Sequence, residues 1–396
     1  MPTATPRPRS GLTERLRMRA GYRWRNSGTT WLVAARTRWD TRNRAAFPSI
    51  RSELGGMSVG YSGLREGLAY TLEFTESRRG DGTGNGRAER ETGELTGRDL
   101  RSPVRLPDAD VSIVGTSAAR ARRLPREASL VIPMRVHFVI DFEGDAEWAR
   151  QRISKRERWQ FARNQRRYGW TWSLDHDPGW FDEFYDRYYR PTMFKRHGER
   201  ERTETKDVSY ECLFRHGRMF VLSQGGERVG GALCHWDPSA RVLTLRLLGV
   251  FEGLEEHYTS GAFKAIYHLL IRWCAEHGVR RLDFQGTEPF LSKGTYQWKR
   301  RFGTRVILPP NHFGAKRLWL QVRRDTPAVR DFLVANPMLS EAADATLEAV
   351  YFHDAERPPR SDYAAKSPGV ERVRHVDLDA FLAGARSGAS HGRARS

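Results

Sequence analysis

The chain has 396 residues, 39% of them apolar and 11% aromatic, which is enough to bury one large or two medium cores and excludes wholesale disorder. Lys and Arg total 67 against 48 acidic residues, and the resulting net charge of +19 favours polyanionic partners: nucleic acid, phosphorylated cofactors or anionic lipid surfaces. Three scattered cysteines exclude a disulfide framework and a zinc site, and the lack of a long apolar run or a secretory signal predicts a cytoplasmic protein, soluble or peripheral to the membrane.

The N-terminal region, residues 1–50, is a basic extension with two apolar clusters, one of them at 30–35. Such a segment either forms a basic amphipathic helix on an anionic membrane or RNA, or remains a mobile tail. Residues 57–74 then have the apolar and glycine pattern of strand, turn and strand. From 78 to 102 the chain is rich in Gly and charge with few apolar residues, which predicts a disordered loop that interrupts a domain.

Buried strands are predicted at Val111–Gly115 and Leu130–Asp141, and they resume the sheet begun before the loop. Residues 145–168 predict a helix rich in cations, which Gly169 ends. The arginines between 152 and 167 could form a basic surface for RNA or a membrane.

The second half carries clearer signals. A helix is predicted after Asp177, a polar loop over 190–207, and a meander of three strands between 219 and 250 with Gly and Pro turns. In these strands apolar residues either alternate with polar ones, as in half-buried strands, or follow one another without interruption, as in buried strands.

A helix over 262–277 and a strand over 281–284 complete this half. Three strands, a helix and a further strand predict an α/β layer on one mixed sheet. Beyond Pro337 the apolar density falls, so residues 336–396 are predicted to be a C-terminal extension with a basic tail.

Three segments carry a family resemblance: Ser154–Arg158, Leu282–Phe290 and Gly294–Gly303. With the order of elements, they resemble acyltransferases of the GNAT superfamily, in the branch that includes FemAB-type peptidoglycan-bridge enzymes and CelD-like proteins of polysaccharide biosynthesis. FemAB-type enzymes are similar in carrying a lysine after an aromatic residue near the end of their second fold. Here that lysine is Lys299, after Trp298.

The resemblance implies an α/β protein with a mixed sheet flanked by helices, in two GNAT-like halves. The N-terminal half over 51–144 would be degenerate, and the acyltransferase domain would span 145–335. The implied activity is transfer of an acyl group from an activated donor to an amine or hydroxyl acceptor, which would be a small molecule or a cell-envelope component.

One departure from the superfamily concerns the donor. Acetyl-CoA enzymes carry a Gly-rich loop whose N–H groups hold the pyrophosphate, and the matching junction here, Glu255–Ala262, has one glycine and two carboxylates. Acyl-CoA, including acetyl-CoA, is the first donor expected, without a metal. Aminoacyl-tRNA, the donor of FemAB relatives, is the alternative and suits the basic charge. A further alternative is a non-catalytic protein that binds RNA or a membrane.

Acyl transfer needs a proton acceptor and stabilisation of the oxyanion. Glu288, in a turn just beyond the strand at 281–284, is the first candidate base, and Lys299 is the candidate for stabilising negative charge. Asp283 could serve as a second carboxylate and Gln285 could hydrogen-bond the acceptor. Each has an ordinary alternative: an ion pair, a turn contact or a solvated basic face.

Other candidates follow from residue type and place. His235 has a pKa suited to proton transfer, and Arg246 is a charge within an apolar strand that needs an anionic partner. Six more residues are predicted to contact substrate or phosphate: His257, Tyr258, Lys264, Arg196, His197 and Arg301. Compositional bias toward arginine in a GC-rich genome could explain much of the basic excess without any function.

Overall fold

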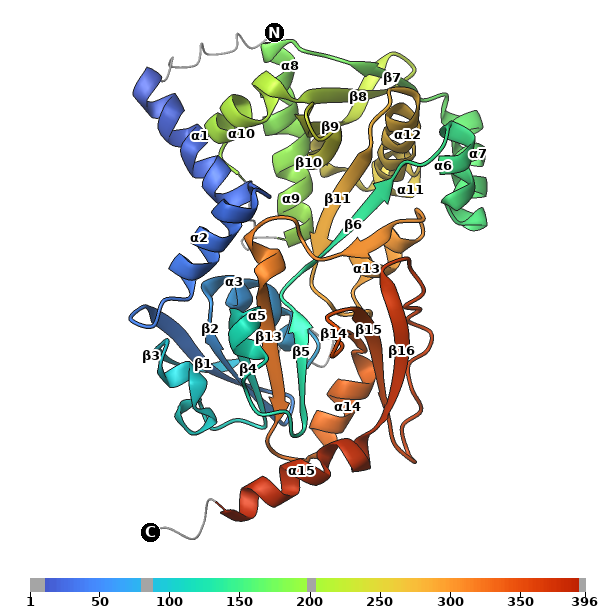
Figure 1. Ribbon diagram of the computed structural model, residues 1–396. Helices are drawn as coiled ribbons and strands as arrows, with labels where there is room; N and C mark the ends of the chain where they lie inside the picture. The colour runs from blue at the N-terminus through green and yellow to red at the C-terminus, as the bar shows by residue number, and fades with distance from the viewer. Residues whose placement is uncertain (1–10, 80–87, 198–203, 392–396) are drawn as a thin grey trace. The chain divides into compact units, whose positions relative to one another are not determined.

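The computed structural model describes residues 11–79, 88–197 and 204–391, and the chain divides into two compact units. Unit 1 contains Met1–Arg25, Phe138–Gln285 and Lys299–Arg305; unit 2 contains Asn26–His137, Gly286–Trp298 and Val306–Ser396. The units are therefore interleaved in sequence, which differs from the predicted boundaries at 144 and 335. The mixed α/β class with sheets flanked by helices is confirmed (Figure 1).

A seven-stranded mixed sheet belongs mainly to unit 1, in the order β12-β6-β11-β10-β9-β8-β7. Its strands are β6 (Val136–Asp141), β7 (Thr171–Leu174), β8 (Arg218–Gln224), β9 (Glu227–Asp237), β10 (Val242–Val250), β11 (Arg281–Thr287) and β12 (Arg305–Ile307). The predicted meander is confirmed, because β8, β9 and β10 pair antiparallel. β11 then joins β10 in parallel, after a helical crossover.

The helices of this unit account for the remaining predictions in the second half. They are α1 (Leu12–Asn26), α6 (Ala146–Arg152), α7 (Lys155–Tyr168), α8 (Pro178–Glu183), η4 (Phe184–Tyr189), α9 (Arg190–His197), α10 (Lys206–Cys212), α11 (Glu255–Thr259) and α12 (Ala262–Glu276). α13 (Gly294–Arg300) belongs mostly to unit 2 and only its end, from Lys299, belongs to unit 1. The single helix predicted over 145–168 is wrong, because Ile153 is extended and Ser154 caps a second helix. The loop predicted over 190–207 is also wrong at both ends, where α9 and α10 form.

Unit 2 contains a six-stranded sheet in the order β3-β1-β2-β4-β13-β5 and a three-stranded sheet in the order β14-β15-β16. The strands are β1 (Ala46–Leu54), β2 (Met57–Gly63), β3 (Glu89–Thr96), β4 (Val111–Ser117), β5 (Ser129–Pro133), β13 (Lys316–Val322), β14 (Met338–Glu341), β15 (Leu347–His353) and β16 (Val370–Asp377). The helices are α2 (Thr30–Asp40), α3 (Arg65–Gly67), η1 (Leu68–Leu72), α4 (Glu73–Ser77), α5 (Ala118–Ala121), α14 (Pro327–Ala335) and α15 (Leu378–His391). Among the residues described, no helix is long and apolar enough to span a membrane.

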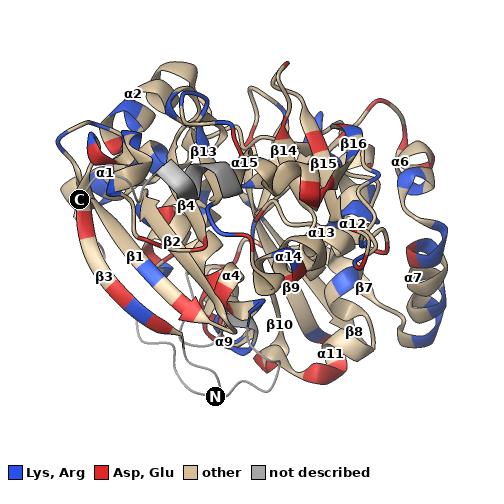
Figure 2. Ribbon diagram, turned by 90° about the horizontal axis from the view of Figure 1, so that it is seen from below, with Lys and Arg blue, Asp and Glu red and all other residues tan. Residues whose placement is uncertain are grey.

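Several predictions for this unit are wrong for identifiable reasons. The second strand predicted within 57–74 is helical from Arg65 onward, where Leu72 and Phe74 turn to the core. β3 lies in the loop predicted to be disordered; it is an exposed edge strand of alternating charge (Figure 2), held by pairing with β1 rather than by burial. The predicted tail at 1–50 forms α1, α2 and part of β1, and the predicted C-terminal extension forms the three-stranded sheet.

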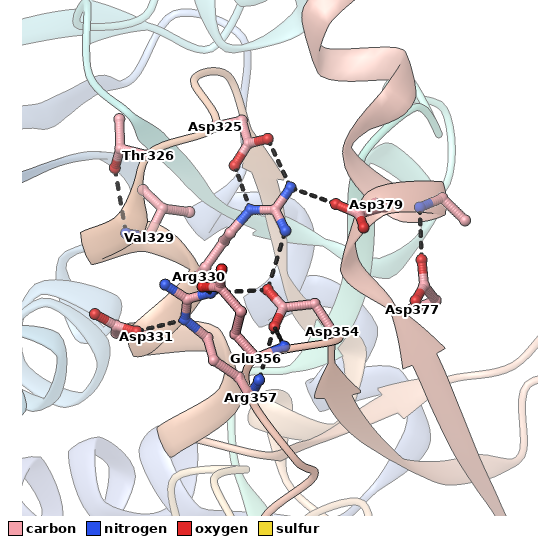
Figure 3. Close-up of polar contacts among 11 residues, drawn as sticks. Asp325, Thr326, Val329, Arg330, Asp331, Asp354, Glu356, Arg357, Asp377 and Asp379 are labelled. Atoms are coloured by element: carbon pink, nitrogen blue, oxygen red, sulfur yellow. Dashed lines mark hydrogen bonds and ion pairs between the residues drawn. The ribbon is translucent and has the colours of Figure 1, made fainter.

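Arg330 of α14 ties the C-terminal elements of unit 2 together (Figure 3). Its guanidinium pairs with Asp325 at 2.7 Å, Asp354 at 3.0 Å and Asp379 at 2.7 Å, and Arg357 also reaches Asp354 at 3.0 Å. A cavity of about 420 Å³ lies among these groups. The buried carboxylates that line it are already paired with these guanidinium groups, so we interpret the network as one that stabilises the fold.

A second ionic network fixes α2 on unit 2. The ammonium of Lys316, fully buried in β13, lies 2.8 Å from both Asp40 of α2 and Glu66 of α3. Burial raises the pKa of each carboxyl, but Lys316 and its hydrogen bonds outweigh burial and leave both pKa values lowered. The two carboxylates are therefore ionised at neutral pH and share one buried cation, and Asp40 also pairs with Arg36 of its own helix at 2.8 Å.

We expect Lys316→Met to lower the free energy of unfolding by roughly 3–5 kcal/mol at pH 7, because it leaves two carboxylates without their buried partner. Carboxyls with lowered folded pKa values stabilise the fold above their unfolded pKa, and this stabilisation disappears as the pH falls through the folded values. The difference should therefore shrink below about pH 4. Urea unfolding at pH 7 and pH 3.5 measures it.

Lys206→Met is the matched control, because Lys206 also lies between two carboxylates, Asp182 at 2.9 Å and Asp186 at 2.6 Å, but is 30% exposed. Its cost should stay below about 1 kcal/mol. Equal losses in the two variants would contradict the role given to Lys316.

Candidate functional site

Strands β10 and β11 part after three residue pairs. Val242 pairs with Arg281, Leu243 with Leu282 and Thr244 with Asp283. Both strands continue, β10 to Val250 and β11 to Thr287, yet within the described chain the parallel ladder has no further pair. Backbone groups on the facing edges are thus released from each other. On β11 the Gln285 N–H and the Phe284 and Gln285 carbonyls bond to Asp283 and Lys299 instead, so the facing edge of β10 is the one that can bind a ligand.

A row of three polar residues crosses the sheet at the point of divergence. Thr244 pairs with Asp283 on one side and with His235 of β9 on the other. Residues that pair directly across strands share a face of the sheet. Phe284 points to the opposite face, where its ring lies 4.9 Å from that of Tyr267 in α12. The structure therefore brings the predicted residues His235 and Asp283 onto one face, away from α12.

Arg246 occupies a β-bulge directly beside this row. The register of β9 and β10 shifts between Leu245 and Leu247, so Arg246 is the extra residue, and bulges of this kind redirect side chains. Its guanidinium lies 5.3 Å from the ring centroid of Tyr22 and 3.7 Å from the carboxylate of Glu204. The anionic partner that the sequence required is thus Glu204, and Tyr22 is a neighbour that sequence reasoning missed.

His235 also lies near Tyr22, with the two ring centroids 6.3 Å apart. Burial, and secondly the charge of Arg246, lower the pKa of His235 below its ordinary value of 6.5. The imidazole is therefore neutral at pH 7 and keeps a nitrogen lone pair that can accept a proton.

The end of β11 is held in an unusual conformation. Gln285 has a positive φ of 57°, and its N–H donates to the Asp283 carboxylate at 2.6 Å. The ammonium of Lys299 donates to the carbonyls of Phe284 at 2.6 Å and Gln285 at 3.1 Å, and the side chain is 6% exposed. The Gln285 side-chain nitrogen is buried and has no hydrogen-bond partner among the described residues. Backbone strain beside an unsatisfied amide is typical of functional positions.

Lys264 and Arg301 meet at the start of α12. Both pair with Glu157 of α7, at 3.0 Å and 3.4 Å, and Glu157 is almost fully buried while the two cations stay 33% and 40% exposed. Asn164 donates to the carbonyl of Ser260 at 2.7 Å, just before α12 begins. Sequence reasoning missed Glu157, although it is the one acidic residue in the cationic helix and lies at the third helical position after the capping Ser154.

Other predicted residues lie apart from the row. His257 is buried in α11, and burial lowers its pKa, while the Tyr258 ring lies 5.2 Å from that of Phe263. Arg196 and His197 end α9, and their side chains lie outside the described part of the chain.

Glu288 belongs to unit 2. Its carboxylate accepts from the Thr287 hydroxyl at 2.7 Å and lies 3.2 Å from the Lys293 ammonium. Burial raises the pKa of Glu288, but Lys293 and Arg135 outweigh it and leave the pKa lowered. The Glu288 carboxylate is therefore ionised at neutral pH and already engaged by Thr287 and Lys293.

One group of residues has the chemistry of a metal site. Asp40, Glu66 and His312 place one possible ligand atom each within 4.8 Å of one another. The ammonium of Lys316 already lies 2.8 Å from both carboxylates, so a cation of the chain occupies the position. These residues therefore do not fit a resident metal ion.

No family model matches the chain, and no curated protein matches it in sequence. Among solved structures it is similar to the C-terminal domain of a putative lysylphosphatidylglycerol synthetase from Agrobacterium fabrum, with 10% identity and a TM-score of 0.36 over 80% of this chain and 94% of that one. It is also similar to FemX, with 12% identity and a TM-score of 0.36 over 46% and 61% of the two chains. A GCN5-related N-acetyltransferase from Sphaerobacter thermophilus has 14% identity and a TM-score of 0.30 over 70% and 76%.

We expect Gln285→Gly to stabilise unit 1 by about 1 kcal/mol, because glycine adopts a positive φ without strain and removes the unsatisfied amide. Thermal unfolding measures the gain. Ala345→Gly is the control. Ala345 has a φ of 65° in an exposed turn, so relief of its backbone strain should stabilise the chain by a similar amount. A destabilised Gln285→Gly beside a stabilised Ala345→Gly would show that the Gln285 side chain supports the fold instead.

Proposed function

We propose that unit 1 transfers an acyl group from an activated donor to an amine or hydroxyl acceptor by direct attack in a ternary complex. The divergence of β10 and β11 supports this most, because it frees backbone groups beside His235, Asp283 and Arg246. A donor arm lying between the strand edges would find N–H groups to polarise its carbonyl and C=O groups to accept from its amides.

The step forms one bond and breaks one. The acceptor nitrogen or oxygen attacks the acyl carbonyl while His235 takes the acceptor proton. The bond between the acyl carbon and the carrier then breaks, and His235 returns the proton so that the carrier leaves as its thiol or hydroxyl. His235 is preferred to Glu288 as the base because it shares a face of the sheet with Asp283 beside the divergence of the strands and is neutral at pH 7. Gln285 would donate its free amide hydrogens to the acceptor or the oxyanion.

Lys299 has a modified role in this proposal. Its ammonium is hydrogen-bonded to two backbone carbonyls, so it acts first by holding Gln285 and the end of β11 in place. Its buried charge also favours negative charge developing nearby. Lys299 is thus a positioning residue rather than a direct contact of the acyl group.

Acyl-CoA is the proposed donor, acetyl-CoA among its members. The N–H groups at the start of α12 and the exposed ends of Lys264 and Arg301 together offer positive charge to a phosphorylated carrier. The proposed acceptor is a small molecule or a cell-envelope component.

Aminoacyl-tRNA is the alternative donor, and the charge of α7 favours it. Six cations of this helix have no carboxylate partner within the described residues, against the single buried acid Glu157 (Figure 2). They are Lys155, Arg156, Arg158, Arg163, Arg166 and Arg167. A polyanion as large as tRNA would be held by such a surface and released by salt.

We expect Lys264→Ala to raise the KM for the phosphorylated donor roughly tenfold or more with little change in kcat, because it removes a charge-assisted contact made equally in the ground and transition states. Labelled acetyl-CoA and aminoacyl-tRNA, each supplied with an amine, measure this. Arg272→Ala is the control, since Arg272 is 70% exposed on the same helix. Turnover of aminoacyl-tRNA alone, lost on neutralising Arg163, Arg166 and Arg167, would establish the alternative donor.

We expect His235→Gln to lower kcat by roughly 10²–10⁴-fold, because the proton acceptor is lost. Activity of the unaltered chain should fall as the pH drops through the pKa of His235, below 6.5, and the variant should lack this limb. The unfolding temperature of His235→Gln shows whether that variant is folded, and His277→Gln is the control variant. Full activity in His235→Gln would point to Glu288, and failure to turn over either donor would favour a non-catalytic binding protein.

A further inference from the structure

Helix α2 has one face docked on unit 2 and another face exposed. Leu32, Arg36 and Asp40, spaced by four residues, form the docked face, with Leu32 buried and Asp40 paired to Lys316. Trp31 and Trp39, eight residues apart on a neighbouring stripe, are 65% and 60% exposed. Side chains of this size are seldom left so exposed without a partner.

Arginines gather where α2 ends. The Arg42 guanidinium lies 4.3 Å from the Trp39 ring centroid and donates to the Trp39 carbonyl at 2.7 Å. Arg101 and Arg120 both donate to the side-chain oxygen of Asn43, at 2.8 Å and 2.7 Å. Two guanidinium groups therefore share a single neutral acceptor.

This cluster lacks compensating negative charge. None of Arg42, Arg101 and Arg120 pairs with a carboxylate within the described residues, and one Arg120 nitrogen, Nη1, is buried without a hydrogen-bond partner. Gly97 permits the close packing, since a Cβ there would lie 2.9 Å from the Arg42 carbonyl oxygen. Arg330, by contrast, pairs with three carboxylates. A cluster held together without acids is suited to an external anion.

We propose that the stripe of Trp31, Ala35 and Trp39, together with the cluster of Arg42, Arg101 and Arg120, is a docking surface for an anionic phospholipid bilayer. Tryptophan rings favour the interface between headgroups and acyl chains, and guanidinium groups bind lipid phosphates. The helix lies on the bilayer through its flank and does not span it.

The arrangement of the rings favours lipid over nucleic acid. The two rings lie along one helix about 12 Å apart, with Ala35 between them, which gives a continuous apolar strip. A cation lies over Trp39, whereas none of the described cations lies over Trp31. Stacking of bases would use an aromatic platform lined by cations throughout. The proposal stands independently of acyl transfer in unit 1.

Flotation of the full chain with vesicles tests the proposal. We expect binding to vesicles of phosphatidylcholine with phosphatidylglycerol, weak binding to phosphatidylcholine alone, and loss of binding as salt rises. Trp31→Ser with Trp39→Ser should abolish most of the binding, and Arg101→Gln or Arg120→Gln should weaken it roughly fivefold each.

Trp159→Ser is the matched control, because Trp159 of α7 is also 60% exposed beside cations but lies on another helix. It should leave vesicle binding unchanged, and thermal unfolding should show every variant folded. Undiminished binding of the double tryptophan variant, or an equal loss in Trp159→Ser, would overturn the proposal. So would a failure to bind either vesicle combined with Trp31-dependent binding of single-stranded RNA.

Discussion

The separation of β10 and β11 after Thr244 and Asp283 is the constraint on which the rest of unit 1 depends. Two local features enforce it: the bulge at Arg246 turns one strand, and the positive φ of Gln285 turns the other. Lys299 then holds the second strand by the carbonyls of Phe284 and Gln285. Since a bulged residue and a left-handed residue both interrupt regular pairing, the strands cannot close again beyond this point.

The high positive charge of the chain is distributed unevenly between structural and free groups. Arg330 and Lys316 are each surrounded by carboxylates, so they stabilise the fold and present little charge to a partner. Cations without acids gather at α7 and around Asn43. Compositional bias could explain the number of arginines, but it does not explain why some of them pair with acids and others do not.

Local patterns predicted those elements whose stability is local. The meander, the helix now seen as α12 and the strand β11 carry strong periodicity and turn signals, and they form as expected. β3 was not predictable, because an exposed edge strand has little apolar signal and depends on its pairing with distant β1. In the same way, Asp283 and Gln285 were found from the motif, while Tyr22 and Glu157 come from other elements and become neighbours of the site only through packing.

The carboxylates near α12 differ in how they bear on the proposed donor site. Glu255 and Glu256 stand close to the helix start in sequence, yet they are 70% and 71% exposed and belong to the separate helix α11. Glu157, distant in sequence, is the acid that reaches the cations, and its near-complete burial keeps it from competing with a phosphate for solvent-facing donors. By binding one side of Lys264 and Arg301, it would orient their exposed ends toward the phosphate of the proposed donor. A buried acid in such a place therefore favours phosphate binding by preorganising the cations, even though it removes one unit of positive charge.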